Sequence, residues 1–335
     1  MKDFFYNLSF FLAKILAAAL SLLLIIFVVV TIIKKQEISG ADRIVVEKLN
    51  DKYESIRLAM QKQLVDGHEY KKILKKAEKN KDKKDKQVFV LNFKGDMNAS
   101  AVKTLREEIT AVLSVADAGD EVILCMESYG GTFHSYGLAV SQLQRIKDKK
   151  VPLTIAVDKA AASGGYMLAC MADRLVAAPY AIVGSIGVIL AMPNFHRFLK
   201  KHDIDYEQIT SGEYKRILTM FGENTEKDRN KAREQVKDAF RLFKDHIIKY
   251  RSIVDLEKAG TGEYWYASQA QSLSLNLVDE LMTSDDLLLA TSREADIYKV
   301  RYIPQKTLSQ YFRSALSLII GDTLQAILNS SYEQP

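Results

Sequence analysis

The sequence predicts an α/β protein in which one N-terminal transmembrane helix precedes a large domain of repeated strand-helix units. Two observations predict this fold. Residues 15–33 form an apolar run interrupted only by Ser21 and Thr31, and from residue 87 onward β-prone runs alternate with segments of helical periodicity. With 335 residues, 48% of them hydrophobic and 27% charged, the chain is large enough for an anchor and a sizeable buried core.

The apolar run over 15–33 has 19 residues, which is long enough for a helix to cross the hydrocarbon core of a bilayer. A cleavable signal peptide would have a shorter apolar region followed by small residues at a processing site. Lys34 and Lys35 follow instead. The sequence therefore predicts a retained, single-pass anchor over residues 1–34 that contacts membrane lipid.

Positive charges flank the predicted anchor unevenly. Lys2 and Lys14 precede it, whereas a larger group of basic residues follows it closely. That group consists of Lys34, Lys35, Arg43, Lys48 and Lys52. A positive-inside count favours a cytoplasmic position for the rest of the chain, although large domains can cross a membrane despite such flanking charge.

Residues 35–86 form a charged, lysine-rich region between the anchor and the main domain. From Lys71 to Lys86 only Ile73, Leu74 and Ala77 are apolar, so a linker that is helical in part is predicted. This region either attracts anionic lipid headgroups or serves as a solvated tether. The lack of aromatic residues between the lysines argues against a nucleic-acid partner.

The predicted catalytic domain covers residues 87–290, and its elements alternate between strands and helices. Strands are predicted over 88–93, 122–126 and 153–157, and helices over 102–112 and 136–146. Such alternation is typical of parallel strands joined by crossover helices. A C-terminal extension, residues 291–335, is predicted to hold one amphipathic helix around 312–320.

The apolar stretch over 175–192 resembles a second membrane span in composition alone. Pro179, Gly184 and Gly187 interrupt it, so a buried strand-turn-strand segment is predicted instead.

Two elements are predicted beyond this stretch. Residues 206–210 form a strand-like run that leads into a Ser-Gly turn. Thr225 with Asp228 forms a capping-box pattern, which predicts the start of a long helix over 225–247.

Ser163 follows three alanines and precedes two glycines. A serine attacks a carbonyl only when a base removes its proton, and a lysine can do so where burial favours the neutral amine. Lys215 follows Ser163 by 52 positions, and Ser185 follows it by 22. The amide of Gly164, directly after the serine, is placed to donate to a developing oxyanion.

An isolated Ser-Gly-Gly sequence is more often a packing or capping solution than a catalytic site. A second glycine pair strengthens the functional interpretation here. They are Gly130 and Gly131 of the run Ser128-Tyr129-Gly130-Gly131, which begins directly after Cys125-Met126-Glu127.

These residues and their spacing resemble the short-form signal peptide peptidase A (protease IV) family, and the whole chain is similar to its SohB-type membrane-bound branch. The likeness covers roughly residues 88–281. It implies that Ser163 is the nucleophile, that Lys215 is the general base and that Ser185 hydrogen-bonds the lysine. It also implies that the amides of Gly131 and Gly164 form the oxyanion hole.

The resemblance further implies a crotonase/ClpP-like fold and a serine endopeptidase that cleaves polypeptides, namely signal-peptide remnants or membrane-derived fragments. In this family the protomers form homo-oligomeric rings in which the lysine of one protomer serves its neighbour. The family likeness places the chain in a bacterial inner membrane with a periplasmic catalytic domain, opposite to the charge count. Two residues depart from the family pattern: Tyr129 replaces a proline, and Asn276 replaces a glycine but tolerates a left-handed conformation.

Other residues compete with Lys215 for the role of base. Lys159 is nearest to Ser163 in sequence, but its position at a strand end does not orient its amine onto the hydroxyl. Five histidines are present, and none repeats the ClpP-type spacing of a histidine shortly after the serine. They are His68, His134, His196, His202 and His246.

Two other function classes stay open at this point. One is a catalytically silent membrane scaffold, and the other is a crotonase-like acyl-CoA enzyme, which shares the oxyanion architecture without a serine-lysine pair. No HExxH, paired CxxC or Walker sequence occurs, so no metal or cofactor is predicted. Cys125 and Cys170 are the only cysteines and are predicted to be buried free thiols.

Overall fold

The computed structural model describes residues 43–79 and 84–304, together with positions 14, 16 and 20. The predicted anchor over 15–33 and the predicted helix around 312–320 therefore lie outside the described residues, apart from positions 16 and 20. No helix in the part of the chain that the structure describes is long and apolar enough to cross a bilayer.

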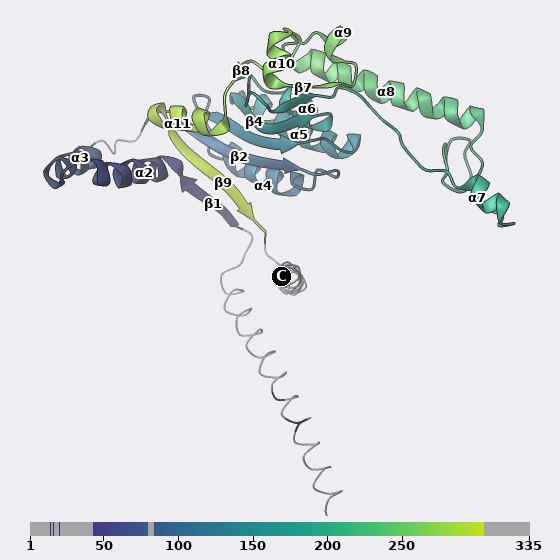
Figure 1. The fold of residues 1–335 in the computed structure, drawn as a ribbon, viewed down its shortest axis with the longest axis horizontal. Helices are drawn as coiled ribbons and strands as arrows, with labels where there is room; N and C mark the ends of the chain where they lie inside the picture. The colour runs from purple at the N-terminus through teal and green to yellow at the C-terminus, as the bar shows by residue number, and fades with distance from the viewer. Residues whose placement is uncertain (1–13, 15, 17–19, 21–42, 80–83, 305–335) are drawn as a thin grey trace, which may run out of the picture. The chain divides into compact units, whose positions relative to one another are not determined.

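A largely parallel β-sheet forms the centre of the described structure (Figure 1). Its strand order is β1-β9-β2-β3-β4-β5-β8, and β6 pairs with β4 and with β7. The strands are β1 (Arg43–Lys48), β2 (Gln87–Gly95), β3 (Glu121–Ser128), β4 (Leu153–Ala162), β5 (Arg174–Ala177), β6 (Ile182–Gly184), β7 (Tyr264–Tyr266), β8 (Glu280–Leu281) and β9 (Asp296–Ile303). The pairs β2–β3, β3–β4 and β4–β6 are parallel, so the C-terminal ends of these strands meet at one edge.

Helices connect the strands and cover both faces of the sheet. They are α2 (Leu49–Leu64), α3 (Gly67–Lys79), α4 (Val102–Leu113), α5 (Phe133–Asp148), α6 (Gly164–Ala169), α7 (His196–Lys201), α8 (Glu226–Tyr250), α9 (Leu256–Ala259), α10 (Ala267–Ser272) and α11 (Ser284–Glu294). The predicted strands over 88–93, 122–126 and 153–157 and the helices over 102–112 and 136–146 are confirmed. The predicted α/β class is confirmed with them.

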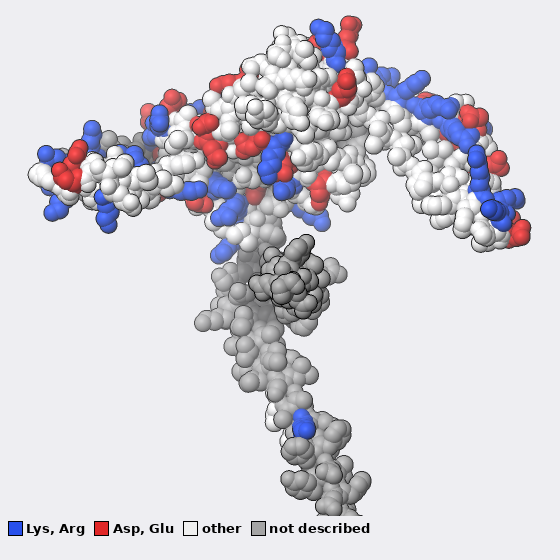
Figure 2. Space-filling view, viewed as in Figure 1, with Lys and Arg blue, Asp and Glu red and all other residues white. Residues whose placement is uncertain are grey.

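The long helix α8 begins where the capping-box pattern predicted. The Thr225 side chain accepts from the amide of Asp228, and the Asp228 carboxylate accepts from the amide of Thr225. Charged side chains follow the outer edge of this helix (Figure 2), while Phe243 and Ile247 are buried. The amphipathic pattern therefore fixes which side of α8 meets the core.

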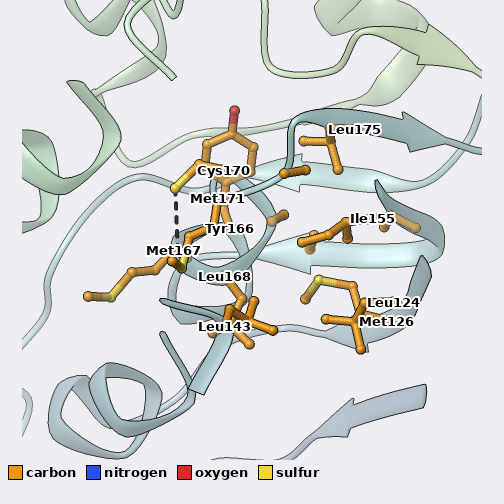
Figure 3. Packing of buried hydrophobic residues seen from close by; sticks show 14 of the residues in the cluster. Leu124, Met126, Leu143, Ile155, Tyr166, Met167, Leu168, Cys170, Met171 and Leu175 are labelled. Atoms are coloured by element: carbon orange, nitrogen blue, oxygen red, sulfur yellow. Dashed lines mark hydrogen bonds between the residues drawn. The ribbon is translucent and has the colours of Figure 1, made fainter. Parts of the chain in front are cut away.

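Alternation along the strands divides the core between the two faces of the sheet. Phe89, Leu91 and Phe93 of β2 join the larger cluster, which is built with α4, α5, α6 and α8. Figure 3 shows part of this cluster, with Leu143 of α5 and Tyr166 of α6 labelled. Val88 and Val90 point to the opposite face, where α2 and α11 cover them. Because successive side chains of a strand point to opposite faces, one buried strand supplies both clusters.

Two stretches differ from the sequence-based expectations. Residues 206–210 form no strand, because this part of the chain finds no neighbouring strand to pair with. The apolar stretch over 175–192 is buried only as far as Ile186, and Ile189 is 90% exposed. Asn276 has φ +57°, as its replacement of a glycine predicted.

The sheet also includes strands on either side of the predicted catalytic domain. β1 lies before residue 87, and β9 extends beyond residue 290 to pair with β2 in parallel. Asn50 in the first turn of α2 fixes this junction, because its amide donates to the carbonyl of Ala295 at 3.0 Å and accepts from the amide of Ile297 at 2.7 Å.

A buried ion pair joins the end of α8 to the segment before β8. The Arg251 side chain is 4% exposed and contacts Asp279 at 2.5 Å, and it also donates to the carbonyl of Asn276 at 2.8 Å. The other carboxylate oxygen of Asp279 accepts from the amide of Leu175 at 2.7 Å. This one carboxylate therefore ties a helix end to the central sheet.

We expect Asp279→Ala to lower the free energy of unfolding by about 3–5 kcal/mol, because it leaves a buried guanidinium without its counter-ion. The matched control is Asp238→Ala, which breaks an exposed pair with Arg241 on the same helix and should cost less than about 1 kcal/mol. Urea unfolding followed by the fluorescence of Trp265 measures both. Equal losses in the two variants would contradict the assigned role of Asp279.

Candidate active site

Ser163 occupies the sharp turn between β4 and α6. Its backbone has φ +52° and ψ −121°, a conformation that a non-glycine residue keeps only when the surrounding structure enforces it. Its amide donates to the carbonyl of Gly184 at 2.8 Å, and its carbonyl accepts from the amide of Met167 at 3.0 Å. The turn therefore holds the serine at the C-terminal edge of the sheet, where ligands bind in open α/β sheets.

Two glycines bring backbone directly against this turn. A Cβ atom on Gly130, which has φ +90°, would lie 2.8 Å from Ser163 Cβ and 2.8 Å from the amide nitrogen of Gly164. A Cβ atom on Gly164 would lie 2.6 Å from the ring of Tyr136. The loop after β3 and the turn after β4 can approach this closely only because neither residue has a side chain.

The amides of Gly131 and Gly164 belong to the residues that directly follow Gly130 and Ser163, which lie against each other. Within the described residues neither amide donates to a protein acceptor, whereas the amide of Gly130 donates to the hydroxyl of Ser128 at 3.1 Å. Two free N–H groups next to a serine hydroxyl are the donors that a tetrahedral oxyanion needs. The structure thus places the loop that carries Gly131 against the turn that carries Ser163 and Gly164.

Ser185 lies one residue beyond the carbonyl that accepts from Ser163. It has φ +50°, and its amide donates to the carbonyl of Glu263 at 2.7 Å. Its hydroxyl makes a long hydrogen bond of 3.4 Å to the carbonyl of Gly262. Ser185 therefore belongs to the same edge of the sheet as Ser163, with its hydroxyl exposed.

Lys215 lies elsewhere, in a segment that we call the arm and define as residues 188–224. Its side chain is exposed, and the residues next to it are fixed to the first turns of α8. Glu213 contacts Lys227 at 2.5 Å, and the ring of Tyr214 lies 5.2 Å from Lys231 Nζ. The base predicted from the sequence is therefore held at the N-terminal end of α8.

The length of α8 separates this lysine from the serine of the same chain. His246, near the C-terminal end of α8, contacts the carbonyl of Met167 at 2.8 Å and so fixes α6 there. Because an α-helix rises about 1.5 Å per residue, the contacts of the arm and of α6 lie about 25 Å apart along α8. Figure 1 shows α7 of the arm at the opposite end of α8 from α6.

The rival bases are engaged elsewhere. Lys159 Nζ lies 3.4 Å from a carboxylate oxygen of Glu127. Burial lowers the pKa of His246, whose ring contacts the carbonyl of Met167, and His134 is exposed in the first turn of α5. No contact of these residues within the described structure directs a basic nitrogen at Ser163.

Sequence reasoning named the pair Gly130 and Gly131, but it missed the contact of Gly130 with Ser163 and the roles of Ser128 and Tyr136. Gly130 packs against Ser163 itself. The hydroxyls of Ser128 and Tyr136 lie 2.5 Å apart next to the glycine loop, the loop after β3 that contains Gly130 and Gly131. The sequence contained one indication of the role of Tyr136, because this tyrosine lies on the apolar face of a helix just after the glycine pair. Its hydroxyl needs a buried partner there, which a leucine or phenylalanine would not.

Comparisons with known proteins cover nearly the whole chain. Residues 3–143 match the family model described as peptidase family S49 N-terminal, and residues 145–298 match that of peptidase family S49. A Haemophilus influenzae protein named "Probable protease SohB" is 49% identical over 251 residues, which cover 73% of this chain and 70% of that protein.

A second relative matches over a longer stretch than the first. A protein of the same name from Buchnera aphidicola subsp. Schizaphis graminum is 41% identical over 321 residues, covering 92% of this chain and 93% of that protein. Among solved structures, a 1510-N membrane-bound stomatin-specific protease has a TM-score of 0.42 and 15% identity, covering 65% of this chain and 98% of that one.

We expect Gly130→Ala to reduce the reaction of Ser163 with a serine-directed phosphonate at least about tenfold, because the methyl group forces the loop away from the serine. The positive φ and the crowding should also cost about 1–3 kcal/mol of stability. Gly137→Ala in α5 is the matched control, since its Cβ would meet nothing within 4 Å and helix propensity favours alanine by about 1 kcal/mol. Unchanged labelling of Gly130→Ala would contradict the assigned close approach.

Proposed function

Because the chain belongs to peptidase family S49 and resembles SohB proteases over most of its length, we propose that it is a membrane-anchored serine endopeptidase with a Ser163–Lys215 dyad. The observation that supports this best is the strained turn at Ser163, against which the glycine loop after β3 packs closely. A crotonase/ClpP-like arrangement of the sheet is part of the same proposal.

In the proposed reaction the hydroxyl of Ser163 attacks the scissile carbonyl of a polypeptide. Neutral Lys215 accepts the hydroxyl proton, and the carbonyl oxygen becomes an oxyanion that accepts hydrogen bonds from the amides of Gly131 and Gly164. The lysine then returns the proton to the leaving amine as the C–N bond breaks, which leaves an acyl-enzyme. Water, activated by the same amine, hydrolyses the ester and restores the serine.

A neutral amine at Lys215 requires an environment that the single chain does not supply. An exposed lysine is an ammonium and cannot accept a proton, whereas burial favours the neutral amine. In the described structure Lys215 is exposed and about 25 Å along α8 from the contacts of α6. We therefore propose that Lys215 serves Ser163 of a neighbouring protomer, and that the contact between protomers buries it.

The composition of the arm supports such an assembly. None of its described residues is buried, yet it carries many large apolar side chains, and Ile209 is 98% exposed. The exposed ones are Ile189, Leu190, Met192, Phe195, Phe198, Ile204, Tyr206, Ile209, Tyr214, Met220 and Phe221. Apolar surface of this extent is typical of protein interfaces, and a head-to-tail contact that closes would give the ring that the family likeness implies.

The membrane assignment and the substrate complete the proposal. The run over 15–33 would anchor the chain in a bacterial inner membrane, with the catalytic domain on the periplasmic side. Signal-peptide remnants or membrane-derived polypeptides are the proposed substrates, because an anchored protease meets such fragments at the membrane surface.

Complementation between inactive variants tests the shared dyad. We expect Ser163→Ala and Lys215→Ala each to abolish phosphonate labelling and peptidase activity of the full chain. Random mixing of the two variants should restore about a quarter of the wild-type activity, because one neighbouring pair in four then combines an intact serine with an intact lysine.

Lys159→Ala is the control in this experiment and should keep activity within about twofold, since its amine pairs with Glu127 rather than with Ser163. A mixed oligomer that stays inactive would contradict the shared dyad. Peptidase activity that survives Ser163→Ala would favour a scaffold or an acyl-CoA enzyme at this site.

A further inference from the structure

A chain of buried hydrogen bonds runs beneath the predicted oxyanion loop. The amide of Gly130 donates to Ser128 Oγ at 3.1 Å, the hydroxyls of Ser128 and Tyr136 lie 2.5 Å apart, and Tyr136 Oη donates to the carbonyl of Asp96 at 2.9 Å. The side chains of Ser128 and Tyr136 are fully buried. This chain therefore links the ends of β2 and β3 to the start of α5.

The chemistry of the partners fixes the direction of each hydrogen bond. The carbonyl of Asp96 can only accept, so the hydroxyl proton of Tyr136 is directed to it. The hydroxyl of Ser128 must then donate to Tyr136 Oη, which leaves a lone pair of Ser128 Oγ to accept from Gly130. Each donor in this series of hydrogen bonds has one acceptor, and linked hydrogen bonds of this kind strengthen one another in a medium of low dielectric constant.

The ring of the same tyrosine supports the second predicted donor. A Cβ atom on Gly164 would lie 2.6 Å from Tyr136 Cγ, and one on Gly95 would lie 2.4 Å from the hydroxyl of Tyr136. The ring thus lies directly under the backbone of Gly164, while the hydroxyl holds Gly130 through Ser128. One side chain therefore contacts one wall of the predicted oxyanion hole directly and supports the other through Ser128.

We propose that Tyr136, acting through Ser128, is a positioning residue that holds the amides of Gly131 and Gly164 in the geometry that receives the oxyanion. This inference rests on the proposed peptidase function and adds residues that the dyad does not include. The amide of Gly130 is directed to Ser128, which fixes the peptide unit directly before the one that carries the amide of Gly131.

The hydroxyl distinguishes this role from simple core packing. A phenylalanine would fill the same space and keep the edge-to-face contact with Phe93, whose ring centroid lies 6.5 Å away. Burial raises the pKa of Tyr136, so the hydroxyl stays a donor throughout the pH range of an assay. Removal of the Tyr136 hydroxyl should therefore lower kcat without shifting the pH dependence of the activity.

The test compares two buried tyrosines of the full chain. Tyr136→Phe should lower kcat about 10- to 100-fold, because displacing an oxyanion donor costs less than the 10²- to 10³-fold loss from removing one. KM should stay within about threefold, since the contacts to the ground state persist. A peptide boronate, which forms a tetrahedral adduct with the serine, should lose affinity by the same factor as kcat/KM.

Tyr166→Phe is the matched control. Tyr166 is equally buried, and its hydroxyl donates to the carbonyl of Leu277 at 3.0 Å, away from the glycine loop. This variant should lose a similar hydrogen bond yet keep kcat within about twofold.

Ser128→Ala tests the same series of hydrogen bonds with a smaller change. It replaces Tyr136→Phe as the test if that variant does not fold. It should lower kcat about 10- to 100-fold, and the double variant should lose no more than the stronger single variant, because both remove one connected unit. Wild-type kcat in Tyr136→Phe or Ser128→Ala, with Ser163→Ala inactive, would overturn this inference and leave the proposed function intact. Equal losses of kcat in Tyr136→Phe and Tyr166→Phe would also overturn it, whereas an active Ser163→Ala would overturn the proposed function.

Discussion

The rigid helix α8 separates the proposed nucleophile from the proposed base of the same chain. It spans Glu226–Tyr250, 25 residues, and it contacts the arm near one end and α6 near the other. An amine acts as a base only when burial disfavours its ammonium form, and the described structure leaves Lys215 exposed. The proposed chemistry therefore requires a second protomer, both to supply the lysine and to exclude water from it.

The other half of the site is complete within one chain and depends on close backbone approach. Parallel pairing brings the ends of β3, β4 and β6 to one edge of the sheet. The glycines at these ends let the loop after β3 contact the turn at Ser163. The hydrogen bonds that link Gly130, Ser128, Tyr136 and Asp96 then hold that loop, and we infer that they position the amide of Gly131.

Much of the fold could be predicted from the sequence, because local pattern and burial agree along most of the chain. The buried strands β2, β3 and β4, the helix α8 with its capping box and the left-handed Asn276 all follow from residue type and spacing. The arm could not be predicted in this way. Residues 206–210 have the composition of a strand, but a strand forms only where a partner strand is available, and sequence spacing does not reveal that partner.

The candidate site shows the same division between local and long-range information. Ser163 and its glycines could be found from the sequence, because a serine between small residues at a strand end is a local pattern. The role of Tyr136 depends on contacts with Ser128 and Asp96, which lie outside its own helix in the sequence. The separation of Lys215 from Ser163 depends on the direction of α8 relative to the sheet. The spacing of residues in the sequence does not predict that direction.

An experimental structure of the assembled full chain would test the shared dyad most directly. The account predicts that Lys215 Nζ of one protomer lies within hydrogen-bond distance, about 3 Å, of Ser163 Oγ of its neighbour. It also predicts that the arm is covered by that neighbour. An assembly in which every Lys215 amine faces bulk water, with no serine oxygen in reach, would contradict the account.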